Sequence, residues 1–273
     1  MDPSLEKTAS CLREKSVVSL LAVDFVNELM SHPSVDSDHT SDPYLPMDPL
    51  EAIMSGEYAK DVDVMIGFDE DEALIGTEWL YAAPDLFGVA KQLWSILGPY
   101  ALLQKHTSEI TEDDIQFTKE ILNFYCGPLE NLNFEHFENF TKMASDSFFW
   151  FGTNRFLDLH MEQSAGNTFF YRFKYYVVNT QTCQQSTSLY FQGEYHFHSG
   201  APGNNHYPGV SHSDELVLQW NPMGRDHPLN QEDSEVSLAM TTMWTNFVKY
   251  GHPTPPDQDL GFTWAPVTPD NKE

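Results

Sequence analysis

The stretch "VMIGFDEDEALIG", residues 64–76, decides the fold class of this 273-residue chain. The apolar residues Val62, Val64, Met65 and Ile66 form a compact run that ends at Gly67. A short apolar run of this kind is typical of a strand in a buried sheet. Four acidic residues, Asp69–Glu72, follow it directly. In open α/β sheets, functional groups gather at the carboxyl ends of strands, so this acidic loop is a candidate site.

A second strand leads toward a histidine. Residues 168–178, "TFFYRFKYYVV", are aromatic and β-branched, with Arg172 and Lys174 alternating with apolar neighbours, and predict the strongest strand of the chain. Residues 179–211 are predicted to be a long loop, which leads to His212. An acid after one strand and a histidine after a later one are the last two members of a Ser–acid–His triad in chain order. The acid would orient the imidazole and stabilise the imidazolium.

The remaining segments are predicted mainly as helices. Apolar spacing indicates helices over residues 7–30 and over most of 86–165, and "DPLEAIMSG" (48–56) has the Pro and Gly of a short one. A last helix is expected to begin at a Ser234 cap and end at Gly251, with an apolar face that includes Val248. No internal repeat or linker is evident, so a single α/β domain over 1–273 is predicted.

Simpler interpretations of the acids and the histidine stay open at this point. Four acids in a loop are most often a solvated surface, and a histidine in a Gly- and Pro-rich loop is most often exposed without a role. A metal site is a further alternative, because several histidines lie in or beside one loop. These are His196, His198, His206 and His212. Their spacing matches no familiar zinc pattern.

The sequence contains no G-x-S-x-G motif for a nucleophile. The nearest approach is "GVSHS", residues 209–213, with Ser where the last Gly would stand. A nucleophile elbow needs a buried strand before it and a helix after it, whereas loop residues precede Ser211. Ser211 is therefore not predicted to be the nucleophile, and no nucleophilic serine is assigned within this chain.

Composition narrows the classes of partner. The formal net charge of −27 argues against binding to nucleic acid or to an anionic membrane surface. No apolar run is long enough to span a bilayer, and the first residues lack the features of a signal peptide, which by itself indicates a cytoplasmic protein. The three cysteines, Cys11, Cys126 and Cys183, form no C-x-x-C pair. Asn139, in "NFT", is a candidate glycosylation site.

Two of these motifs resemble one family. "VMIGFDEDEALIG" resembles the segment of type-B carboxylesterases and cholinesterases in which a strand and a Gly lead to an acidic "DEG" motif. The resemblance puts the catalytic glutamate at Glu72, with Ala73 where the family usually has Gly. "GVSHSDEL" resembles the family's histidine loop and puts the catalytic histidine at His212, followed by the acidic pair Asp214 and Glu215. Further matching segments are "CLREKSVVSLL", "FFYRFKYY", "MWTNFVKYGHPTPP" and "FTWAPVTPDNKE", in the family's order.

The resemblance implies an α/β-hydrolase fold, of which residues 1–273 are the C-terminal part: late strands of the central sheet with large helical insertions. It implies hydrolysis of a small-molecule carboxylic ester by a Ser–Glu–His triad, without cofactor or metal. The N-terminal part with the nucleophile elbow would be the absent partner, so the isolated chain is expected to be inactive. The full-length protein would be secreted, and Cys11 would pair upstream. The alternative is a non-catalytic, cholinesterase-like adhesion protein, which the residue at the missing serine position would distinguish.

Overall fold

The computed structural model describes residues 3–16, 35–37, 40–175, 209–220 and 229–271. The backbone divides into two units, Met1–Tyr58 and Ala59–Glu273. The first unit contains α1 (Pro3–Arg13) and α3 (Pro49–Ser55). The short helix predicted at 48–56 is confirmed: Asp48 caps it, and Gly56 closes it with a φ of 75°. The helix predicted over 7–30 is observed as far as Arg13, and residues 17–34 lie outside the described part of the chain.

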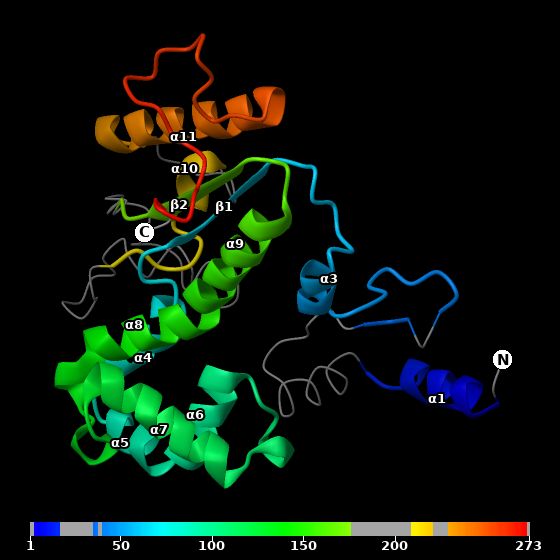
Figure 1. Ribbon diagram of the computed structural model, residues 1–273. Helices are drawn as coiled ribbons and strands as arrows, with labels where there is room; N and C mark the ends of the chain where they lie inside the picture. Colours follow the sequence, from blue (N-terminus) through cyan, green and yellow to red (C-terminus); the bar gives the residue numbers. More distant parts are fainter. Residues whose placement is uncertain (1–2, 17–34, 38–39, 176–208, 221–228, 272–273) are drawn as a thin grey trace. The chain divides into compact units, whose positions relative to one another are not determined.

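Two parallel strands form the sheet of the second unit (Figure 1). Strand β1 (Val64–Asp69) pairs with β2 (Thr168–Phe173), with Val64 opposite Thr168 and Asp69 opposite Phe173. Both predicted strands are confirmed, with different ends. β1 runs through Gly67 to Asp69 instead of ending at the glycine, and β2 stops at Phe173. Because the strands are parallel and end in register, the chain leaves both of them at the same edge of the sheet.

A helical segment connects the two strands, as predicted for residues 86–165. It begins with α4 (Leu74–Ala82), α5 (Leu86–Gln92), α6 (Trp94–Leu103) and the 3₁₀ turn η1 (Thr107–Glu109). It continues with α7 (Glu112–Cys126) and the 3₁₀ turns η2 (Leu129–Asn131) and η3 (Phe134–His136). The amino end of α7 carries a capping box made by Thr111 and Asp114. Apolar side chains of these helices share one core with Leu74, Phe87, Trp94, Leu122 and Phe137 among its buried members.

The last part of this connection is one continuous helix with a wider turn inside it. It consists of α8 (Phe137–Ser145), a π-helical turn η4 (Asp146–Trp150) and α9 (Phe151–Gln163). The Trp150 ring packs against Phe68 of β1 and Phe170 of β2, with centroids 5.2 and 5.7 Å apart. The helix therefore covers one face of the sheet with η4 at the carboxyl end of β1.

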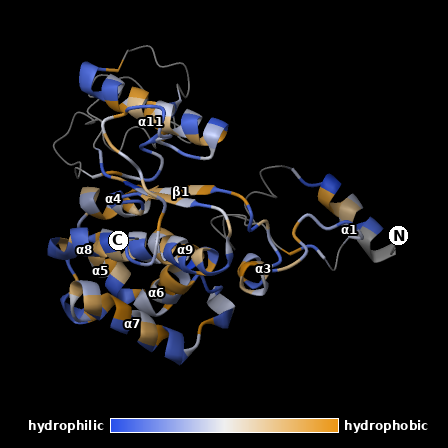
Figure 2. Ribbon diagram, turned by 45° about the horizontal axis from the view of Figure 1, so that its top comes forward, coloured by the Kyte–Doolittle hydropathy of each residue, from blue (hydrophilic) through white to orange (hydrophobic). Residues whose placement is uncertain are grey.

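The opposite face of the sheet is covered by the C-terminal helices. These are α10 (Leu216–Gln219) and α11 (Gln231–Tyr250), which contact each other. Both hydrophobic and hydrophilic residues occur along α11 (Figure 2). Its Trp244 meets Tyr171 of β2 with ring centroids 5.1 Å apart. Among the described residues, no helix is long and apolar enough to cross a membrane.

The predicted start of this last helix is wrong. Asn230, not Ser234, caps α11 by accepting the N–H of Asp233, and the Ser234 hydroxyl donates to the Asn230 carbonyl from inside the helix. Both residues are good caps, and the helix takes the earlier one because Gln231 to Asp233 can also be helical. Val248, predicted on the buried face, is 84% exposed. The predicted end at Gly251 is confirmed, with a φ of 66°.

The two strands approach each other closely at Gly67, and this contact can be tested by measuring the stability of variants. A Cβ atom at Gly67 would collide with the ring and carbonyl oxygen of Tyr171 on β2. Gly67→Ala is expected to reduce the free energy of unfolding by about 1–3 kcal/mol, as overpacking does. Gly88→Ala is the matched control, because its Cβ would meet nothing within 4 Å on helix α5, where alanine is favoured. Equal loss in both variants, measured by urea unfolding, would contradict the close contact.

Candidate active site

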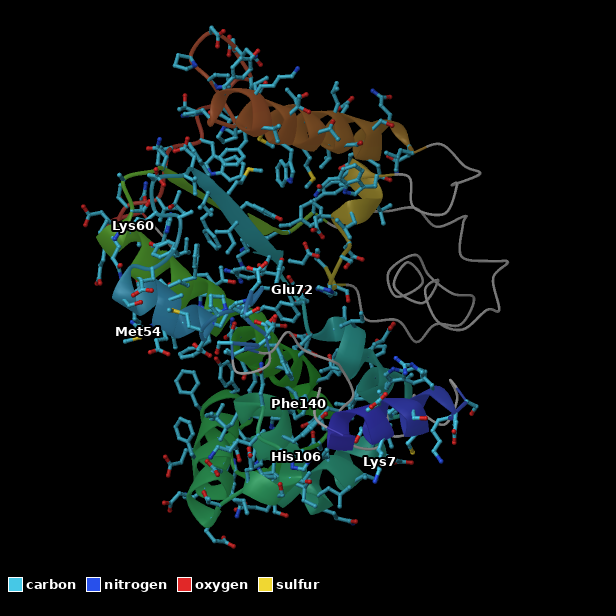
Figure 3. All side chains as sticks on the ribbon, turned by 90° about the vertical axis from the view of Figure 1, so that its right-hand side faces the viewer. Lys7, Met54, Lys60, Glu72, His106 and Phe140 are labelled. Carbon is cyan, nitrogen blue, oxygen red and sulfur yellow. The ribbon has the colours of Figure 1, made fainter. Side chains whose placement is uncertain are left out.

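The acidic loop after β1 is held by buried hydrogen bonds, and Glu72 lies just beyond the tip of the strand (Figure 3). The carboxylate oxygen Oε1 of Glu72 accepts the N–H of Asp69 at 3.0 Å. The next residue, Ala73, donates its N–H to the Ser145 hydroxyl at 3.0 Å, at the end of α8. The Glu72 side chain is thereby fixed in the interior, with 7% of its surface exposed.

The histidine loop, residues 209–216, is hydrogen-bonded to this acidic loop, residues 69–72, at three places. Asp71 and Val210 bond twice, since the Asp71 N–H donates to the Val210 carbonyl at 2.8 Å and the Val210 N–H donates to Oδ2 of Asp71 at 3.1 Å. The N–H of His212 donates to the Glu72 carbonyl at 3.3 Å. The N–H of Asp214 donates to Oδ2 of Asp69 at 3.2 Å. Every second residue of the histidine loop, from Val210 to Asp214, is thus hydrogen-bonded to the acidic loop.

These hydrogen bonds bring the two predicted site residues, Glu72 and His212, together. Nδ1 of His212 lies 2.7 Å from Oε2 of Glu72. Because a carboxylate only accepts hydrogen bonds, Nδ1 carries the hydrogen, and Nε2 is then the ring nitrogen that can take up a proton. The His212 side chain is 44% exposed, in contrast to the buried Glu72. Its ring also contacts Phe149 of η4, with centroids 5.3 Å apart.

Carboxyl groups around this pair are strongly perturbed. Burial raises the pKa of Asp69 to about 10, and the nearby Glu215 and Glu72 carboxyls add to the rise. Burial also raises the pKa of Asp214 to about 8, although the N–H of Ser211, which bonds its Oδ2, works in the opposite direction. Clusters of perturbed groups of this kind are typical of functional sites.

The next acid of the loop, Glu70, is in a different environment. It accepts a hydrogen bond from Nη2 of Arg172 at 2.6 Å and lies 3.5 Å from the Lys174 ammonium. Both cations belong to the β2 side of the sheet, so the basic residues that alternate along this segment pair directly with Glu70. Asp69 and Glu72 of the same loop are buried.

The structure decides some of the alternatives that the sequence left open. Asp69 and Glu72 are buried, so the acidic loop is not merely a solvated surface. Within the described residues no cluster of three metal-ligating side chains occurs, and His196, His198 and His206 lie outside them. Ser211 is buried beside His212, with its N–H bonded to Asp214.

Two further predictions concern the sequon and the cysteines. Asn139 is exposed on α8, whereas the Thr141 hydroxyl of the same sequon is buried 2.7 Å from that of Thr77, so glycosylation stays a prediction. Cys126 is buried in the helical core, and burial raises the pKa of its thiol to about 11. Cys11 is exposed, and Cys183 lies outside the described residues.

Several supporting residues were missed by sequence reasoning. Ser145 and Phe149 lie far from both motifs in sequence, and no local pattern marks them as neighbours of Ala73 and His212. The roles of Asp69 and Asp71 had a signal, since both belong to the acidic run. Spacing alone does not show which acid of that run binds backbone N–H groups.

Comparisons with known proteins agree with this geometry. A model of the carboxylesterase family matches residues 2–273. The chain belongs to the carboxylesterase family. Among curated family relatives, juvenile hormone esterase of Tribolium castaneum is 24% identical over 92% of this chain and 40% of its own length. Esterase FE4 of Myzus persicae is 24% identical over 76% of this chain and 34% of its own length.

A solved structure shows the same fold. Juvenile hormone esterase from Manduca sexta, crystallised with OTFP covalently attached, superposes with a TM-score of 0.68 at 21% identity. The match covers 99% of this chain and 47% of that one. This carboxylesterase-family chain therefore spans less than half the length of the relatives it matches, and the α/β-hydrolase fold predicted for it is shared over that length.

The bond from Ala73 to Ser145 provides a test of how the acidic loop is held. Ser145→Ala leaves the buried Ala73 N–H without this acceptor, which is expected to cost about 1–3 kcal/mol of unfolding free energy. Ser95→Ala, at an exposed position of α6, is the control and is expected to change stability by less than about 0.5 kcal/mol. A comparably small effect of both changes on urea unfolding would show that Ser145 does not anchor the loop.

Proposed function

We propose that this chain supplies the acid and the base of a Ser–Glu–His triad in a carboxylic ester hydrolase. The observation that carries the proposal is the 2.7 Å hydrogen bond between the buried Glu72 carboxylate and the half-exposed His212 imidazole. It orients the imidazole with Nε2 away from the acid. The names of the relatives, juvenile hormone esterase and esterase FE4, support an ester as the substrate class.

In the proposed reaction a serine hydroxyl attacks the ester carbonyl while Nε2 of His212 takes up its proton. Glu72 stabilises the imidazolium through Nδ1, and the imidazolium then donates the proton to the leaving alcohol oxygen. Water attacks the acyl-enzyme in the same way, with His212 again as base, and releases the acid. Backbone N–H groups beside the serine would stabilise the oxyanion. The reaction needs no cofactor or metal.

The proposal places the serine outside these 273 residues, because no G-x-S-x-G occurs in them. The partner of this chain is then the N-terminal part of the same family domain, and the protein that contains both parts acts on a small-molecule ester. By family resemblance we also propose that this whole protein is secreted and glycosylated at Asn139. The retained Glu72–His212 pair counts against the alternative of a non-catalytic adhesion protein, which has no need of it.

The triad assignment is tested in the protein that also carries the nucleophile segment. His212→Ala or Glu72→Gln is expected to lower kcat by on the order of 10³–10⁴, because the base or its orienting charge is lost. Ser211→Ala is the neighbouring control and is expected to retain ester hydrolysis, since this serine is not the nucleophile. Loss of hydrolysis in the Ser211 variant with near-normal rates in the other two would reverse the assignment.

A second measurement addresses the 273-residue chain alone. It is expected to hydrolyse p-nitrophenyl esters no faster than buffer and to remain unlabelled by a fluorophosphonate, which reports an activated serine. Mass spectrometry of the treated chain checks this directly. A stoichiometric adduct on any serine would place the nucleophile within these residues and contradict the proposal.

A further inference from the structure

We propose that Asp69 and Glu215 share one proton, and that this neutralised carboxyl pair positions the histidine loop. Asp69 is a positioning residue in this proposal, since it acts on His212 only through the backbone of the loop. The inference rests on the proposed function only in giving His212 the role of the base.

The contact between the two carboxyl groups carries the proposal. Asp69, the last residue of β1, is 2% exposed, and the Glu215 carboxyl is close enough to raise the pKa of Asp69 through charge repulsion and a side-chain hydrogen bond. Oδ1 of Asp69 and Oε2 of Glu215 are both buried and have no donor among the described residues. Two ionised carboxylates can only repel each other, whereas one proton between them makes one oxygen a donor and the other its acceptor.

Within the part of the chain that the structure describes, the groups that act on Asp69 include no cation. Among the described residues, the charged groups that act on Asp69 are Glu72, Asp214 and Glu215, all carboxyls. From β2, Tyr171 faces the same cluster, and from α4, Glu78 acts on Asp214. The cations of this region, Arg172 and Lys142, act on Asp71 instead. His212 bonds Glu72 through its Nδ1.

A neutral Asp69 explains how the loop is held in register. Its Oδ2 accepts the N–H of Asp214 and its carboxyl group interacts with that of Glu215, so one side chain engages two consecutive residues of the histidine loop. His212 lies two residues before Asp214. Ionisation of both carboxyls would place like charges in contact inside the protein and push residues 214–215 away from β1. The His212–Glu72 hydrogen bond would then lose its support on this side.

The direction of the pH effect follows from the raised pKa of Asp69, about 10 in the folded chain. An unfolded aspartate has a pKa near about 4. The folded state therefore holds the proton more tightly, and the stabilisation is complete below about pH 4 and is lost as the pH rises through about 10. Unfolding midpoints should accordingly decline between neutral and alkaline pH.

The test uses Asp69→Asn in this chain, followed by thermal unfolding from pH 6 to 10. The Asn amide donates to Glu215 at every pH, and its oxygen still accepts the Asp214 N–H. The variant is expected to unfold on the order of 3 °C higher than wild type at pH 9 and to show a flatter pH profile. Asp257→Asn, the same change in an exposed loop, is the control and should track the wild-type profile. A lower midpoint for Asp69→Asn at pH 7–9 overturns the shared proton.

A second readout reports the position of His212. The ¹⁵N shifts of its ring, assigned by comparison with His212→Gln, show which nitrogen is protonated. Asp69→Leu is expected to lose the fixed Nδ1–H tautomer, and Asp69→Asn is expected to keep it. An unchanged tautomer in the folded Leu variant overturns the positioning role alone. Neither readout needs ester hydrolysis, so failure of the proposed triad in kinetic tests is distinguishable from failure of the carboxyl pair.

Discussion

The candidate site depends on the parallel pairing of two strands that are distant in sequence. Because β1 and β2 end in register, at Asp69 and Phe173, the acidic loop leaves the sheet beside the end of the second strand. The Glu70 N–H continues the pairing by donating to the Phe173 carbonyl at 2.9 Å. A slip of one residue would turn Asp69 to the other face of the sheet. The close fit of Gly67 against Tyr171 disfavours such a slip.

Several buried acids gather at the edge of this sheet in a chain that is already strongly acidic. Most are compensated by backbone N–H groups: Asp71 accepts that of Val210, Glu72 that of Asp69, and Asp214 that of Ser211. These bonds favour the charged form of a carboxyl, whereas burial favours the neutral form. The result is a division of contacts, in which Glu72 bonds the His212 ring and its neighbours hold the two loops together.

The sequence predicted the elements better than their contacts. Strong β propensity marked β2, and a Pro and a Gly marked α3, because these signals are local. The strand ends and the start of α11 were misplaced, since tertiary pairing and a competing cap at Asn230 decide them. Glu72 and His212 were found through order and resemblance. Ser145 and Phe149 were not, because their approach to the site is created by helix packing alone.

The π-helical turn η4 and the residue before it contact different parts of the site. Just before it, Ser145 accepts the Ala73 N–H; in its last part, Phe149 meets His212 and Trp150 packs on the sheet. A π turn holds one residue more than an α turn, and each of its residues rotates the chain by less, so the helix stays nearly in phase on the two sides of η4. One more residue inserted between Ser145 and Phe149 would exceed what a single π turn accommodates and would rotate Phe149 by roughly a quarter of a turn relative to Ser145. Chain length in this helix is thus a geometric parameter of the site, which substitutions that preserve length leave untouched.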